Sequence, residues 1–168
     1  MGGRGASSGA KTKTYALFHG SPNADISEFD VTYSGKNTNS GEKLLYFTDS
    51  KEFADEFSYE RQGTSSRFID KKGNKGRVYE VEVTMKKPLD LRNPTKKDIK
   101  NMIAMSEDEL TEKEILQFSK GNNQLLKTYI DVNQLALYGY DGIIAKVGRG
   151  SDALEYGVVS NKQVKIKK

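Results

Sequence analysis

The sequence predicts an α+β fold in a single domain. Segments with strand character lie at both ends of the chain, helical periodicity is confined to the middle, and no internal repeat is visible. The chain has 168 residues, of which 35% are hydrophobic and 10% aromatic. This length suits one ordinary domain with a complete core, and it leaves no room for two.

The first half of the chain predicts an arm, strands and one helix. Residues 1–14 are rich in Gly and Ser, so we expect a flexible arm there and a domain that spans 15–168. Alternation of apolar and polar residues from Tyr79 to Met85 is typical of a strand with one wet face. The other elements expected here are strands at 15–19 and 44–47, a helix from Lys51 to about Tyr59 capped by Ser50, and loops at 34–42 and 63–76.

The second half predicts helices followed by strands. Pro88 ends the alternating strand, and the residues after it continue in extended form. Apolar residues recur near helical spacing between residues 95 and 137, with two interruptions, which predicts about three short helices. The chain then returns to strands, expected at 142–147, 156–160 and 163–166, with a Gly-rich loop at 148–152.

Composition excludes several kinds of chemistry. The chain has no cysteine, which excludes disulfides, thiolate catalysis and Cys-based metal sites, and its single histidine excludes a His-rich metal site. We therefore expect no metal cofactor. No run approaches the ~18 apolar residues of a membrane helix, and residues 1–13 lack the apolar block of a signal peptide. We expect a soluble protein with no membrane association.

The formal net charge of +4 lies at the two ends of the chain. Residues 1–14 carry +3 and residues 160–168 carry +4, whereas residues 15–159 hold 20 basic and 23 acidic side chains. Basic ends are typical of solvated tails, and they also fit a contact with nucleic acid or another acidic partner. The body of the domain offers no general attraction to an anion.

Three residues are candidates for chemistry. His19 is the only histidine and lies at the end of the first predicted strand, directly before Gly20 and Ser21. Tyr46 ends the second apolar run, and Glu155 follows the Gly-rich loop at the opening of a strand. Taken one at a time, these residues also fit a packed histidine, a core aromatic residue and an exposed strand glutamate.

In this order the three segments resemble the His-Tyr-Glu class of ADP-ribosyltransferases, which includes poly(ADP-ribose) polymerases and diphtheria-type toxins. Leu17-Phe18-His19-Gly20-Ser21 is similar to the His-Gly-Ser/Thr strand of that family, and Leu45-Tyr46-Phe47-Thr48-Asp49 to its Tyr-Phe strand. Leu154-Glu155-Tyr156 is similar to its Glu-Tyr strand, and Gln163-Val164 to the residues that close the domain. The strand start Tyr140-Asp141-Gly142 is similar to small phage and bacterial members.

The resemblance implies a fold and a reaction. The fold would consist of two small facing antiparallel β-sheets with a helical insert near 95–137. The reaction would be transfer of a single ADP-ribose from NAD+ to a macromolecular acceptor, with release of nicotinamide. A protein is favoured over a nucleic acid as this acceptor. The implied protein is a monomer in the cytoplasm of a bacterial host, encoded by a phage or bacterium as an effector or anti-defence factor.

The candidate residues suit cleavage of the nicotinamide–ribose bond. That bond breaks through a cationic, oxocarbenium-like ribose, which the carboxylate of Glu155 can stabilise. The nicotinamide needs an aromatic wall and main-chain hydrogen-bonding groups, which Tyr46 and Gly20 can supply. By resemblance, we expect Glu155, Tyr46 and His19 in catalysis, His19, Gly20, Ser21, Tyr46 and Phe57 in NAD+ binding, and Arg149, Ser151 and Asp152 in an acceptor loop.

Two positions depart from the family pattern. The arginine-modifying branch carries an acidic or amide residue two positions before the glutamate, where this chain has Ala153, so arginine is disfavoured as the acceptor. Phe57 stands where a stacking tyrosine is usual, and it lacks the hydroxyl group. Two alternatives stay open: an NAD+ glycohydrolase with water as the acceptor, and a non-catalytic NAD-binding or phage-structural interaction module.

Overall fold

Seven strands form one β-sheet in the computed structural model, which describes residues 11–34, 41–59, 75–148 and 150–168. The strand order is β4-β5-β6-β2-β1-β3-β7, and all neighbours are antiparallel except β4 and β5, which are parallel. The strands are β1 (Lys13–Ser21), β2 (Leu45–Thr48), β3 (Arg77–Met85), β4 (Pro88–Asp90), β5 (Gly142–Gly148), β6 (Ser151–Val158) and β7 (Val164–Ile166).

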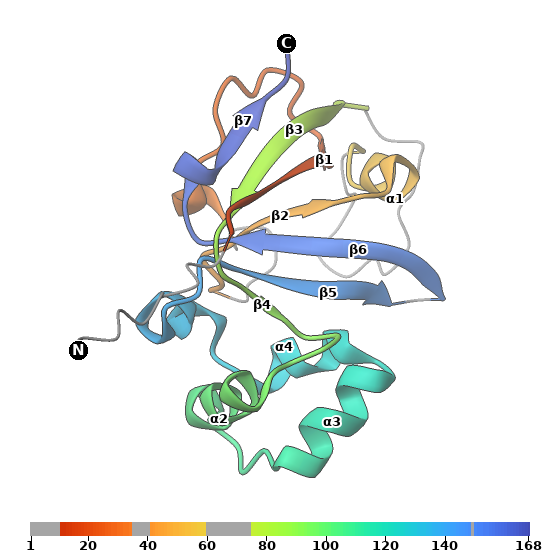
Figure 1. Ribbon diagram of the computed structural model, residues 1–168. Helices are drawn as coiled ribbons and strands as arrows, with labels where there is room; N and C mark the ends of the chain where they lie inside the picture. Colours follow the sequence, from red (N-terminus) through yellow and green to blue (C-terminus); the bar gives the residue numbers. More distant parts are fainter. Residues whose placement is uncertain (1–10, 35–40, 60–74, 149) are drawn as a thin grey trace, which may run out of the picture.

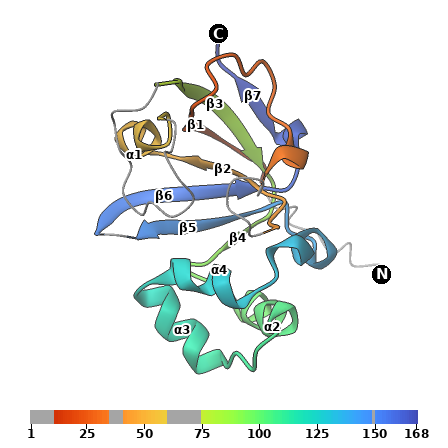
Figure 2. The ribbon, with the colours of Figure 1, turned by 180° about the vertical axis from the view of Figure 1, so that it is seen from behind.

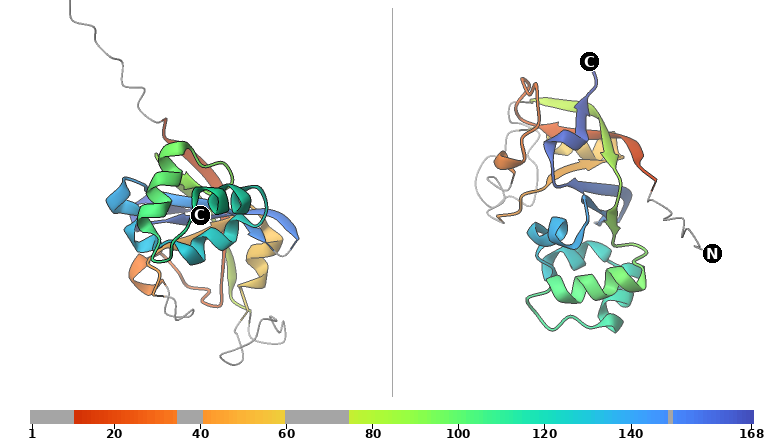
Figure 3. Two further views of the ribbon diagram at one scale, coloured as in Figure 1. Left: turned by 90° about the horizontal axis from the view of Figure 1, so that it is seen from below. Right: turned by 60° about the vertical axis from the view of Figure 1, so that its left-hand side comes forward.

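Helices lie in two places around the sheet. Helix α1 (Lys51–Glu56) follows β2 directly and lies beside β1 and β2, whereas the other α-helices form a block below β4 and β5 (Figure 1). The same separation of helices and strands is seen from behind in Figure 2 and in the right-hand view of Figure 3. The block contains α2 (Lys96–Met105), α3 (Glu112–Lys120) and α4 (Leu126–Tyr129), with the 3-10 turns η2 (Asn123–Leu125) and η3 (Val132–Tyr138); η1 (Val31–Tyr33) and η4 (Asn161–Gln163) lie elsewhere.

The sheet has a thin junction at its centre. Strand β1 pairs with β3 along its whole length, but the described pairing of β1 with β2 is limited to Phe18 and Thr48. Figure 1 shows β3 and β7 running at a steep angle to β5 and β6, on the two sides of this junction. The expectation of an α+β fold is confirmed. The expected division into two facing sheets is not confirmed, because the Phe18–Thr48 pairing joins the strands into one.

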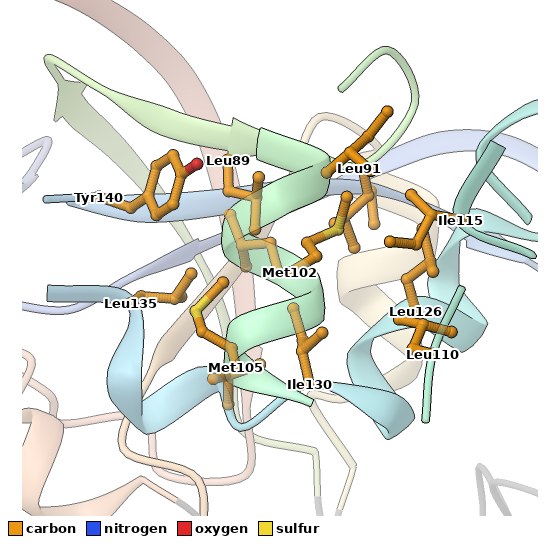
Figure 4. Close-up of a cluster of buried hydrophobic side chains, with 14 of the residues drawn as sticks. Leu89, Leu91, Met102, Met105, Leu110, Ile115, Leu126, Ile130, Leu135 and Tyr140 are labelled. Atoms are coloured by element: carbon orange, nitrogen blue, oxygen red, sulfur yellow. The ribbon is translucent and has the colours of Figure 1, made fainter. Parts of the chain in front are cut away.

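Two apolar clusters pack against the sheet. The larger one joins β4 and β5 to the helical block, where side chains from α2, α3 and α4 point toward one another (Figure 4). The second cluster lies on the opposite face, where Val81 and Val83 of β3 are fully buried and Phe29 packs over Phe47. The residues of the helical cluster that Figure 4 labels are Leu89, Leu91, Met102, Met105, Leu110, Ile115, Leu126, Ile130, Leu135 and Tyr140.

Most predicted elements are present, with shifted ends. Ser50 caps α1 as expected, since its hydroxyl accepts a hydrogen bond from the Phe53 amide. Strand β6 begins at Ser151, five residues before the predicted start, because Ser151, Leu154 and Glu155 already pair with β5. Lys13 pairs with Met85, so the first strand begins two residues before the expected domain start. Residues 1–10 of the predicted arm, and residues 35–40 and 63–74 of the two predicted loops, lie outside the described residues.

Two side chains near the C-terminus, those of Asp141 and Gln163, have structural roles. The carboxylate of Asp141 accepts hydrogen bonds from the amides of Lys86 and Lys87, at 2.5 and 2.9 Å, which fixes the link between β3 and β4. The side-chain amide of Gln163 donates to the main-chain oxygens of Asp141 and Thr84, at 2.8 and 3.2 Å. These residues therefore connect β3, the start of β5 and the start of β7. Their presence in the motifs is explained by these structural contacts, and no catalytic role is needed.

Candidate active site

Tyr46 and Glu155 lie on the same face of two neighbouring strands. In the β2–β6 register Thr48 pairs with Glu155 and Tyr46 pairs with Gly157. Directly paired residues in an antiparallel sheet point to one face, as do residues two positions apart, so the side chains of Tyr46 and Glu155 share a face. A Cβ atom at Gly157 would lie only 2.9 Å from Cε1 of Tyr46, so the glycine leaves the space that the ring occupies.

Asp49 anchors the strand that carries Glu155. Its carboxylate accepts a hydrogen bond from the Leu154 amide at 2.8 Å, and its own amide donates to the Leu154 oxygen at 3.3 Å. These two bonds extend the contact of β2 and β6 beyond Thr48. The residue before Glu155 is thereby held from both its amide and its carbonyl group, which restricts the position of the glutamate.

Lys127 of α4 forms an ion pair with the carboxylate of Glu155. The exposed fractions of the two side chains are 13% and 18%, so the pair is largely shielded from solvent. The Lys127 ammonium also lies 4.7 Å from the centre of the Tyr46 ring, within the range of a cation–π contact. Sequence reasoning missed Lys127, because a lysine on a helix 28 residues before the glutamate carries no local signal of this contact.

The Tyr46 hydroxyl donates a hydrogen bond to Glu42 at 2.9 Å. Burial raises the pKa of Tyr46, and the negative charges of Glu42 and Glu155 raise it further. The phenol therefore stays protonated at neutral pH and acts here as a hydrogen-bond donor. Glu42, Tyr46, Lys127 and Glu155 form one connected polar group, which we call the Tyr46–Glu155 cluster.

The ring of His19 lies on the opposite face from this cluster. Strand alternation places it beside Phe47, at 5.5 Å between ring centres, and Phe29 packs edge-on against it at 4.8 Å. Its Nδ1 lies 2.8 Å from the Tyr46 carbonyl oxygen. Because a carbonyl oxygen only accepts, Nδ1 carries the proton and Nε2 is the acceptor nitrogen of the neutral ring. Burial lowers the pKa of His19, so the ring is neutral at neutral pH.

The other expected NAD-binding residues surround the end of β1. Gly20 lies against α1, and a Cβ atom there would come within 1.7 Å of the Ala54 oxygen, so only glycine permits this approach. Ser21 is buried, and its hydroxyl accepts from the Asn23 amide at 3.2 Å. Phe57 packs edge-on against Phe53 at 5.1 Å between ring centres, at the end of α1.

Of the residues expected in the acceptor loop, Ser151 and Asp152 are the first two residues of β6, directly after the turn that joins it to β5. Gly148 and Gly150 have φ angles of 80° and 74°, a conformation that favours glycine at both positions. The Ser151 hydroxyl accepts from the Ala153 amide at 3.1 Å, and Asp152 is exposed. Arg149 lies outside the described residues. The turn lies at the start of the strand that carries Glu155, as the sequence predicts.

A hollow of about 260 Å³ borders the Tyr46–Glu155 cluster on the side of the helical block. Glu42 and Lys127 belong to its lining, whereas none of the residues expected from the sequence to bind NAD+ does. The described residues contain no group of three or more His, Cys, Asp or Glu side chains able to hold a metal ion. Within the same residues, no helix is long and apolar enough to cross a membrane.

A family model described as ADP-ribosyltransferase in polyvalent proteins matches residues 11–167. The chain belongs to this family. As an ADP-ribosyltransferase it is a transferase that uses NAD+ as its substrate. A search of curated proteins found no match to the chain. The match covers β1 to β7 and the helical block, so the helices belong to the ADP-ribosyltransferase domain.

Proposed function

We propose that this ADP-ribosyltransferase is a mono-ADP-ribosyltransferase of the His-Tyr-Glu class. It would transfer ADP-ribose from NAD+ to a macromolecular acceptor, with a protein favoured as that acceptor, and release nicotinamide. The observation that carries this proposal is the shared face of Tyr46 and Glu155, with an aromatic ring and a carboxylate on paired strands. The resemblance of the surrounding motifs also supports a cytoplasmic role as a phage or bacterial effector.

The chemistry follows from this arrangement. The bond between ribose C1′ and the nicotinamide nitrogen breaks, and the bonding pair leaves with nicotinamide, which becomes neutral. The ribose becomes an oxocarbenium-like cation, which the Glu155 carboxylate stabilises while it accepts a hydrogen bond from a ribose hydroxyl. A nucleophile of the acceptor then bonds to C1′ and loses its proton. The Tyr46 ring supplies an apolar wall for the nicotinamide.

His19 acts from the other side of the sheet in this proposal. Its Nδ1 holds the main chain of Tyr46, and Nε2 is the nitrogen left to accept from a ribose hydroxyl. NAD+ has two riboses and is an extended molecule, so one ribose can lie at Glu155 while the other reaches the junction of β1 and β2. We assign His19 to positioning rather than to proton transfer.

Incubation with NAD+ labelled in its adenylate half, together with a bacterial lysate, tests the proposal. A transferase yields free nicotinamide and a label that stays with macromolecules, and protease or nuclease treatment then identifies the acceptor class. Free ADP-ribose with unlabelled macromolecules would instead indicate an NAD+ glycohydrolase. Absence of nicotinamide release would indicate a binding module and overturn the proposal.

A further inference from the structure

The cation at Glu155 in the free protein comes from the helical block. Helix α4 carries Lys127, and the neighbouring side chain of Leu126 is fully buried in the helical cluster, as Figure 4 shows. Ile130, directly after the helix, is also buried in that cluster. The backbone of α4 is therefore anchored on both sides of Lys127, and the long lysine side chain extends from it to Glu155.

Lys127 contacts both protein groups that bind the substrate in the proposed function. Its ammonium is paired with the Glu155 carboxylate and lies 4.7 Å from the centre of the Tyr46 ring. A carboxylate beside an aromatic face attracts a cation, both through the charge and through the ring quadrupole. The nicotinamide ring of NAD+ is positively charged, and its ribose gains positive charge as the bond breaks. The lysine and the substrate therefore need the same two partners.

We propose that Lys127 is an internal competitor that occupies the nicotinamide–ribose subsite and leaves it when NAD+ binds. This inference rests on the proposed function. An ammonium that stayed on Glu155 would neutralise the carboxylate and repel the developing cation, since like charges a few ångströms apart in a shielded site oppose each other. Rotation of the lysine side chain releases the subsite without any movement of α4. In the free protein the same contact supplies a partner for a carboxylate that is largely shielded from water.

The consequence is that Lys127 lowers the affinity for NAD+ and contributes nothing to the rate of bond breaking. A residue that instead holds Glu155 in its reactive position would act on the rate. The two roles predict different effects when Lys127 is removed. Removal of a competitor lowers KM and so improves NAD+ binding, whereas removal of a positioning residue lowers kcat.

Steady-state nicotinamide release by Lys127→Met, Lys127→Arg and the unmodified chain separates the two roles. Met keeps the length of the side chain and removes the charge. We expect Lys127→Met to lower KM for NAD+ about fivefold with kcat unchanged, because the Coulombic gain of a shielded ion pair is largely offset by the desolvation of its two charges. Lys127→Arg keeps a cation and should retain the KM of the unmodified chain. Lys113→Met, at an exposed position of α3, is the matched control and should alter neither constant.

A KM that is unchanged or higher in Lys127→Met overturns the inference, and a tenfold fall in kcat assigns Lys127 to the positioning of Glu155 instead. Calorimetric titration of the same proteins with NAD+ repeats the comparison without turnover. Tighter binding by Lys127→Met in a chain that releases no nicotinamide would refute the proposed reaction, and it would still support competition between Lys127 and NAD+ for the same subsite. Absence of NAD+ binding by every variant would refute both. Thermal unfolding of each variant verifies that the compared proteins are folded.

Discussion

The Nδ1 atom of His19 lies 2.8 Å from the main-chain oxygen of Tyr46, and this contact joins two strands at the point where their backbone pairing is sparse. The single described pairing of β1 with β2 is Phe18 with Thr48. The imidazole therefore extends the connection between the two parts of the sheet. A residue identified through a catalytic motif also has a structural task, and variants of His19 have to be interpreted with both in mind.

His19 should make the stability of the protein depend on pH. Burial lowers its pKa, and the hydrogen bond to Tyr46 opposes this shift only in part. The unfolded chain then binds the proton more readily than the folded protein, so the free energy of unfolding falls as pH drops below the ordinary histidine pKa of about 6.5. No other histidine is present to obscure this effect.

Urea unfolding of the unmodified chain and of His19→Asn, at about pH 7.5 and about pH 5, measures this effect. Asn can still donate to the Tyr46 oxygen but does not titrate. We expect the unmodified chain to lose more stability on acidification than the variant does. Parallel losses would show that His19 is not the group responsible, because the carboxylates are common to both proteins.

Glu155→Gln should lower the rate of nicotinamide release by a factor on the order of 10² or more, as expected when one transition-state stabiliser is removed. Gln keeps the size of the side chain and can still accept a hydrogen bond from Lys127, but it lacks the charge that opposes the ribose cation. Glu80→Gln is the control, since Glu80 is exposed on β3 and forms an ion pair with Lys51 at the surface. Equal rates for Glu155→Gln and the unmodified chain would remove Glu155 from the chemistry.

Gly20→Ala should destabilise the protein by about 3 kcal/mol, the upper end for forced overpacking. The added methyl group would meet the Ala54 carbonyl of α1, which is main chain and cannot rotate away. Gly41→Ala provides the comparison, because Gly41 has a φ of 66° and a Cβ atom added there would meet no atom of the described residues within 4 Å, so its cost should be near ~1 kcal/mol from backbone strain alone. Chemical denaturation measures the free energy of unfolding of both variants. Equal losses of stability would show that the close approach of Gly20 to Ala54 adds no cost beyond backbone strain.

Asp141→Ala should cost about 2 kcal/mol of stability, because it leaves two amides of the β3–β4 link without an acceptor. Asp25→Ala, at an exposed position, should change stability little. Nicotinamide release per folded molecule should be the same in both variants, since neither residue belongs to the Tyr46–Glu155 cluster. A selective loss of activity in Asp141→Ala, with stability retained, would contradict the structural role of Asp141.

Local patterns determined much of the fold. Alternation from Tyr79 to Met85 identified β3, because one face of that strand is buried against the sheet's apolar cluster. Ser50 identified the start of α1, because capping depends on neighbouring residues alone. The order of three short motifs identified the ADP-ribosyltransferase family and the strands that carry His19, Tyr46 and Glu155. These features are encoded within a few residues of the chain.

Tertiary structure decided how those residues meet. Strand register put Tyr46 and Glu155 on one face and the His19 ring on the other, and register depends on pairing between segments far apart in the sequence. Burial of Leu126 in the helical cluster brought Lys127 to Glu155, a contact determined by long-range packing rather than by any local motif. Local motifs could therefore be predicted from the sequence, whereas the charges around Glu155 could be identified only in the folded structure.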